Sequence, residues 1–186
     1  MKLTDNWIKK YEPCEEGVEW WDGKERDSLK ILRKLIREKR YYWANWLIVR
    51  TMTYKQYVRY AVYAAEQVIS NYEKEYPDDK RPRESIEAAK KCIKNPSIKN
   101  KDAAWSAARS AWSAQGAEAW SAKSAWSTAW SAARSAVESA AWSAEWSAES
   151  AAWSAARSAY WSAAAEAEKA MQLKILKYGM KLITQK

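Results

Sequence analysis

The sequence predicts an all-α fold, a helical bundle with long C-terminal helices rich in alanine, serine and tryptophan. Three observations support this class. Apolar residues recur at intervals of three and four, the spacing that places them on one face of a helix. Only four glycines and four prolines interrupt the chain of 186 residues. From residue 103 onward alanine, the residue with the highest helix propensity, dominates.

A chain of this length forms one domain with a sizeable hydrophobic core. We therefore expect a single helical domain over residues 1–186. Residues 1–100 supply conventional amphipathic helices, and residues 101–186 supply tryptophan-rich helices that pack on them.

The first element is expected to be a short helix around Trp7. Thr4 or Asp5 can cap its N-terminus, and Pro13 ends it. Residues 14–23 follow as a loop that closes at Gly23.

An amphipathic helix begins at Asp27 or Ser28. Its apolar face and its basic face alternate at helical spacing, and a second apolar segment follows at residues 43–49. The apolar face consists of Leu29, Leu32, Leu35 and Ile36, and the basic face of Lys30, Arg33, Lys34 and Arg37.

One longer helix is predicted over residues 54–75. It carries a buried face of small and aromatic residues and ends at Tyr76, because a following proline disfavours helix. Pro82 then suits the first turn of a helix that reaches about Ile93. The buried face consists of Tyr57, Tyr60, Ala61, Ala64, Ala65 and Val68.

The composition changes at Asp102, where the tripeptide Trp-Ser-Ala begins to recur. Every tryptophan after residue 100 is followed by serine, and Val137 is the only aliphatic residue larger than alanine between Ala103 and Met171. Alanine and serine let helices approach closely, so the tryptophans are expected to fill the core around these contacts. The alternative is an exposed aromatic face that binds a partner.

Two breaks are expected in this tract. One lies at Gln115-Gly116. The other lies between Val137 and Trp142, where the tryptophan stripe changes its angular position by roughly 120° at 100° per residue. At this second place the alternative is an unbroken helix whose stripe winds with a 3.67-residue period. A more conventional amphipathic helix is expected over residues 170–183.

The residue types argue against an enzyme. The chain has no histidine, the commonest general base and metal ligand. It shows no paired-carboxylate motif, glycine-rich phosphate loop or carboxylate metal loop. We therefore expect a protein without catalytic residues, metal or cofactor, which acts by binding.

Location and redox state follow from similar evidence. The N-terminus has no apolar signal region and no segment is apolar enough to span a membrane, so we expect a cytoplasmic protein. Cys14 and Cys92 lack metal-site spacing and are expected to be free thiols.

Residues 72–89 read YEKEYPDDKRPRESIEAA. This stretch resembles the hallmark segment of a family of bacterial proteins assigned as immunity proteins in polymorphic-toxin systems. Cys14, Gly17 and Trp20 resemble the family's early Cys-x-x-Gly segment, and residues 43–47 resemble its tryptophan-rich second helix. The resemblance covers residues 14–100 and continues only as composition. It implies an immunity role, whereas the strict Trp-Ser-Ala usage is this chain's own.

Three hypotheses remain open. In the first, the protein neutralises a protein toxin by occlusion. The net charge of +9 then favours an acidic or neutral toxin, because like charges suppress association. In the second, basic and aromatic side chains bind nucleic acid. In the third, small-residue helix faces drive assembly into homo-oligomers. The candidate partner-binding residues are Asp79, Arg81, Arg83, Trp126 and Trp130, although residues 78–84 also read as a purely structural turn.

Overall fold

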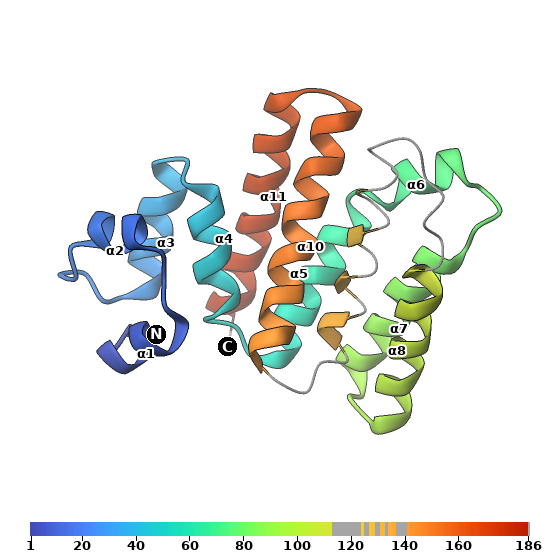
Figure 1. The fold of residues 1–186 in the computed structure, drawn as a ribbon, viewed down its shortest axis with the longest axis horizontal. Coiled ribbons are helices and arrows are strands. Elements are labelled where there is room, and N and C mark those ends of the chain that lie inside the picture. The colour runs from blue at the N-terminus through green and yellow to red at the C-terminus, as the bar shows by residue number, and fades with distance from the viewer. Residues whose placement is uncertain (113–123, 125–126, 129–130, 133, 137–140, 186) are drawn as a thin grey trace.

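The computed structural model describes residues 1–112, 124, 127–128, 131–132, 134–136 and 141–185 (Figure 1). Over these residues the protein is an all-α bundle, as the sequence predicts. Its helices are α1 (Asp5–Tyr11), α2 (Glu15–Trp21), α3 (Ser28–Arg37), α4 (Tyr41–Val49), α5 (Tyr54–Glu66), α6 (Ile69–Glu75), α7 (Arg81–Lys94), α8 (Ile98–Trp112), α10 (Ala141–Ser162) and α11 (Ala165–Thr184).

The bundle is organised around α5. Helix α10 packs along α5, and α11 returns beside α10 as the second arm of a hairpin (Figure 1). Helix α4 contacts both arms of that hairpin, whereas α7 packs on the other side of α5 and carries α8. The N-terminal helices α1, α2 and α3 lie at one end of the molecule, next to α4 (Figure 1).

Both halves of the sequence contribute to one hydrophobic core. The aromatic and small face predicted for residues 54–68 is buried throughout, which confirms that periodicity. The largest fully buried side chains are Tyr60, Tyr72, Leu32, Ile48, Ile86, Ile175 and Leu176.

The loop expected at residues 14–23 is wrong, because Glu15–Trp21 forms α2. Glu15 and Glu16 occupy its first turn, where the helix dipole favours negative charge. At its C-terminal end, the Nε1 of Trp20 donates a hydrogen bond of 2.7 Å to Glu38 Oε2 on the neighbouring segment. This tertiary contact of Trp20 helps to stabilise a helix that contains a glycine.

The continuous helix expected over residues 54–75 is also wrong, because it divides into α5 and α6. The backbone N–H of Val68 bonds to the carbonyl of Ala65, three residues back, instead of four. The Gln67 side chain donates to the carbonyl of Tyr63 at 3.1 Å and so shares the last acceptors of α5. This tight turn lets Val68 and Ile69 both face the core.

The C-terminal tract contradicts the expected tryptophan core wherever its side chains are described. Trp105, Trp146, Trp153 and Trp161 are exposed, whereas alanine and serine side chains of α10 are buried. Helices separated by small side chains pack close together and leave no room for an indole between them. The buried alanines of α10 are Ala148, Ala151, Ala152, Ala155, Ala156 and Ala159.

The last predicted helix is longer than expected, since α11 runs over Ala165–Thr184. The breaks predicted at Gln115-Gly116 and between Val137 and Trp142 fall on residues 115–116 and 137–140, which are outside the described residues. Among the helices of the described segments, none combines the length and apolarity that crossing a lipid bilayer requires.

Candidate functional site

An aromatic stripe runs along the exposed side of α10. At about 100° per residue, its members fall within a sector of roughly 100° of the helix circumference. Trp146, Trp153 and Tyr160 are 50%, 40% and 41% exposed, which is high for such large side chains. We call this surface the α10 stripe; it consists of Trp146, Ser150, Trp153, Arg157, Tyr160 and Trp161.

Helix α4 extends the α10 stripe sideways. Tyr42, which is 56% exposed, contacts Trp153 edge to face with ring centroids 5.8 Å apart. Arg157 is also exposed and forms no ion pair within the described part of the chain. The surface therefore combines tryptophan, tyrosine and arginine, the residue types that dominate binding hot spots.

A buried ion pair fixes the orientation of α10. Arg50, at the end of α4, donates to Glu149 Oε2 at 2.8 Å, and both side chains are shielded from solvent. Arg50 Nη1 also donates to the carbonyl of Trp46 at 2.7 Å. Asn45 bridges the same helices by donating to the carbonyl of Glu149 and accepting from the hydroxyl of Tyr60. These bonds hold α10 in the orientation in which the α10 stripe faces the solvent.

A second glutamate of α10 lies close to this pair. Glu145 is 5% exposed, and its Oε1 accepts a weak hydrogen bond of 3.4 Å from the Tyr11 hydroxyl. Its Oε2 has no hydrogen-bond partner in the described structure. Burial raises the pKa of the Glu145 carboxyl, and the nearby charge of Arg50 only partly opposes that shift.

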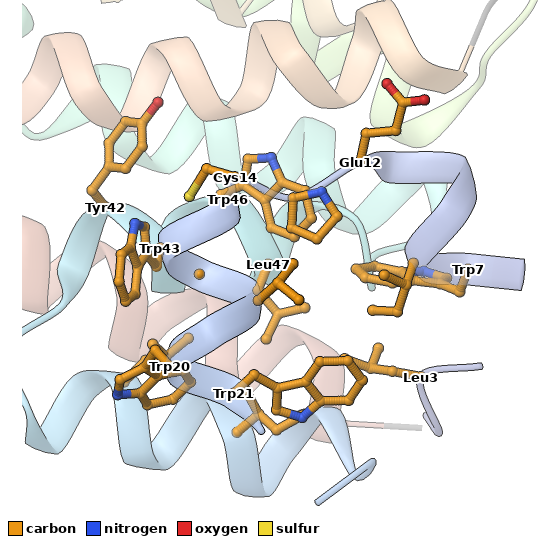
Figure 2. Close-up of a pocket in the computed structure, with 16 residues that line it drawn as sticks. Leu3, Trp7, Glu12, Cys14, Trp20, Trp21, Tyr42, Trp43, Trp46 and Leu47 are labelled. Atoms are coloured by element: carbon orange, nitrogen blue, oxygen red, sulfur yellow. The ribbon is translucent and has the colours of Figure 1, made fainter. Parts of the chain in front are cut away.

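An aromatic cleft of about 320 Å³ opens beside the stripe, between the N-terminal helices and α4 (Figure 2). Trp7 comes from α1, Trp20 and Trp21 from α2, and Trp43 and Trp46 from α4 (Figure 2). Tyr42 also lines the cleft, so the cleft and the α10 stripe share a residue.

Cations already cover several of the cleft's indole rings. Arg50 lies 4.3 Å from the ring centroid of Trp46, and Arg40 lies 4.5 Å from that of Trp43. Lys34 lies 4.4 Å from Trp20. Such contacts stabilise each exposed pair by about 0.5–1 kcal/mol and keep the indoles in place.

The hallmark segment forms a local network. Asp79 accepts from the Tyr72 hydroxyl at 2.7 Å and is paired with Arg81 at 2.7 Å. These bonds, chiefly those from Arg81, lower the pKa of Asp79 to about 2. Arg83 forms a forked pair with Glu73, with nitrogen–oxygen distances of 2.6 and 2.7 Å. The structure thus brings Asp79 and Arg81 together and ties both arginines to α6 and its following turn.

Trp126 and Trp130, the remaining candidate contacts, lie outside the described residues. Their described neighbours approach α10: the hydroxyls of Ser127 and Ser154 are 3.3 Å apart, and Ser131 donates to Ser150 at 3.4 Å. Ser127 and Ser131 therefore lie next to α10, and Ser131 contacts a member of the α10 stripe.

The described residues contain no cluster of three or more histidine, cysteine, aspartate or glutamate side chains that could hold a metal ion. Cys14 is exposed and Cys92 is buried, and both are free thiols, as the sequence predicts. Burial raises the pKa of the Cys92 thiol, which keeps it protonated and unreactive.

Comparison with known proteins gives no relative: no family model, curated protein or solved structure matches this chain. Inferences about function therefore rest on the residues and their geometry, and on the resemblance of the hallmark segment.

Sequence reasoning left an exposed aromatic face open but placed its candidate contacts at Trp126 and Trp130 instead of on α10, and it missed the aromatic cleft. A signal for the stripe existed, since Trp146, Trp153 and Tyr160 are spaced seven residues apart while the positions between them are almost all alanine or serine. A helix with two such faces buries the small one when its neighbours also present small side chains. The cleft combines residues from three helices and had no comparable local signal.

Proposed function

We propose that this protein is an immunity protein that neutralises a bacterial toxin by direct binding and occlusion. One observation carries the proposal: α10 presents tryptophan, tyrosine and arginine outward on a helix whose small-residue side is buried. The resemblance of residues 72–89 to immunity proteins of polymorphic-toxin systems supplies the class of partner. The action is binding rather than chemistry, in the cytoplasm.

The geometry of the α10 stripe favours a protein partner over a small molecule. Trp146 and Tyr160 lie at opposite ends of the stripe, separated by 14 residues or about 21 Å of helix at 1.5 Å per residue. Large apolar side chains exposed in a row are costly for a free monomer and typical of a surface that a partner covers. Arg50 and Glu149 fix the helix beneath them, so little ordering would be needed on binding.

The test compares two variants of the full chain. In Trp146→Ala/Trp153→Ala the centre of the α10 stripe is removed. The matched control is Trp105→Ala, which removes a tryptophan of α8 that is 45% exposed. Each protein is used to capture partners from lysate of the bacterium that encodes it, and the captured protein is then purified.

We expect the captured protein to be a toxin. Its activity should fall to zero when an equimolar amount of the wild type or of Trp105→Ala is added. The stripe variant should capture less of it and inhibit it weakly. A captured protein whose activity is unchanged by saturating wild type would overturn the immunity role. Self-association through the stripe would instead appear as a dimer mass that the stripe variant abolishes.

A further inference from the structure

A second surface brings several basic side chains together. A groove of about 440 Å³ runs between α5 and α7 and reaches Tyr178 of α11. We call it the basic groove; its polar and aromatic lining consists of Arg59, Tyr63, Glu66, Glu87, Lys90, Lys91, Lys94 and Tyr178.

The two acidic side chains of the basic groove are already paired. Lys90 Nζ lies 2.7 Å from a carboxylate oxygen of Glu66 and 2.7 Å from one of Glu87. Arg59, Lys91 and Lys94 are exposed and have no ion-pair partner among the described residues. The groove therefore offers unpaired cations to an incoming anion.

A flat aromatic pair forms one wall of the basic groove. The rings of Tyr63 and Tyr178 stack with centroids 3.9 Å apart and planes inclined by 13°. Both side chains are half-buried, so part of each faces the groove. Lys174 and Lys181 lie one helical turn before and after Tyr178 on α11 and are exposed, which extends the cationic surface.

The basic groove shares no residue with the α10 stripe. The occupant of the groove is thus a ligand separate from the partner of the stripe, and this inference does not depend on the proposed function.

The chemistry of the basic groove favours phosphate over carboxylate. Its unpaired cations are mainly lysines, which bind phosphates as point charges, whereas paired recognition of carboxylates uses the planar fork of arginine. An aromatic wall beside a track of cations is the arrangement that binds single strands, since bases stack and phosphates follow the cations. We propose that the basic groove binds single-stranded nucleic acid without sequence preference.

The experiment measures fluorescence anisotropy of a labelled oligothymidine of about 12 nucleotides, within the usual site sizes of single-strand binders. The salt concentration is varied from about 50 to 200 mM. For three to four phosphate contacts, the slope of log affinity against log salt should be roughly −2 to −3. No binding at about 50 mM salt would overturn the proposal.

Two charge reversals of equal size locate the site. Lys91→Glu/Lys94→Glu should weaken binding at least tenfold and flatten the slope by about 1.4, because two contacts are lost. Arg33→Glu/Arg37→Glu makes the same change in net charge on exposed positions of α3 and should have little effect. Equal losses in both variants would overturn the groove as the site.

Two further measurements distinguish a nucleic acid from an acidic protein as the ligand of the basic groove. Tyr178→Leu should lower the affinity for the oligonucleotide without changing the salt slope, because stacking is lost and the phosphate contacts remain. A poly-glutamate peptide that displaces the oligonucleotide at lower concentration than unlabelled oligothymidine would overturn the nucleic-acid assignment in favour of an acidic protein. The stripe variant Trp146→Ala/Trp153→Ala should bind the oligonucleotide as tightly as wild type.

Discussion

Replacing Glu149 by glutamine should strongly destabilise the protein. The carboxylate of Glu149 lies 2.8 Å from Arg50, and the two side chains are only 12% and 6% exposed. Removing the charge of Glu149 leaves the guanidinium of Arg50 buried, with the carbonyl and the indole ring of Trp46 as neighbours. The Nε of Arg50 already lacks a hydrogen-bond partner, and burial raises the pKa of the nearby Glu145 carboxyl, so that group compensates only in part.

The magnitude follows from the burial of the pair. Losing one partner of a buried ion pair costs about 3–5 kcal/mol, whereas an exposed pair contributes less than about 1 kcal/mol. For a chain of 186 residues, each kcal/mol corresponds to roughly 2–4 °C in Tm, so Glu149→Gln should lower Tm by about 6–20 °C.

Urea unfolding followed by circular dichroism measures the change, with Arg50→Met/Glu149→Met as the control. The double variant removes both charges of the pair and should lose less stability than Glu149→Gln alone. A loss below about 1 kcal/mol in Glu149→Gln would refute the reasoning, because it would show that the pair is solvated in solution.

Three other predictions concern single positions. Because burial raises the pKa of Glu145, the folded state binds its proton more tightly than the unfolded state, and stability falls as pH rises above about 4.5. Glu145→Gln should therefore raise Tm at pH 7, and the gain should vanish at pH values below the ordinary glutamate range. Asp79→Asn should cost about 1–2 kcal/mol at pH 7. This loss of stability should shrink as the pH falls from 3.8 towards 2, because wild-type Asp79 then becomes protonated. Equal losses at pH 7 and near pH 2 would contradict the prediction. Gly179→Ala places a Cβ 2.7 Å from the Ile48 side chain and 2.7 Å from the ring of Tyr60, so it should lower the free energy of unfolding in urea by about 1–3 kcal/mol. The matched control is Gly17→Ala, whose Cβ meets only the Cys14 sulfur at 3.2 Å and which should be neutral or stabilising.

The helical class and the buried faces of the N-terminal half could be predicted because they depend on local periodicity. Leu32 and Leu35 of α3 are buried as their spacing requires, and so are Tyr57, Tyr60, Ala61, Ala64 and Ala65 of α5. Two helix N-caps could also be predicted from the sequence. Thr4 accepts a hydrogen bond of 3.1 Å from the Trp7 amide, and Asp27 accepts hydrogen bonds from the amides of Leu29 and Lys30.

The orientation of α10 could not be predicted, because tryptophan is apolar enough for a core and large enough for a hot spot. The orientation depends on the neighbouring helices: α10 packs along α5, whose buried residues include Ala61, Ala64 and Ala65, and small side chains allow close packing. Burial of Glu149 was also unpredictable, because its partner Arg50 lies 99 residues earlier.

The candidate contacts at the hallmark segment show a related limit. Asp79, Arg81 and Arg83 looked available for a partner in the sequence, but pairing partners within the chain, such as Glu73, are supplied by the fold. Charged residues near a turn indicate that ion pairs will form without indicating whether the partner is internal.

The α10 stripe is most directly tested by measuring affinity and stability together in Trp146→Ala/Trp153→Ala. Titration calorimetry with the purified toxin should show a loss of at least about 100-fold, because truncating a hot-spot residue costs 2 kcal/mol or more. Urea unfolding of the same variant should change by about 1 kcal/mol or less, since both side chains are exposed. Unchanged affinity, or a loss of stability near the 3–5 kcal/mol typical of one core tryptophan, would contradict the account.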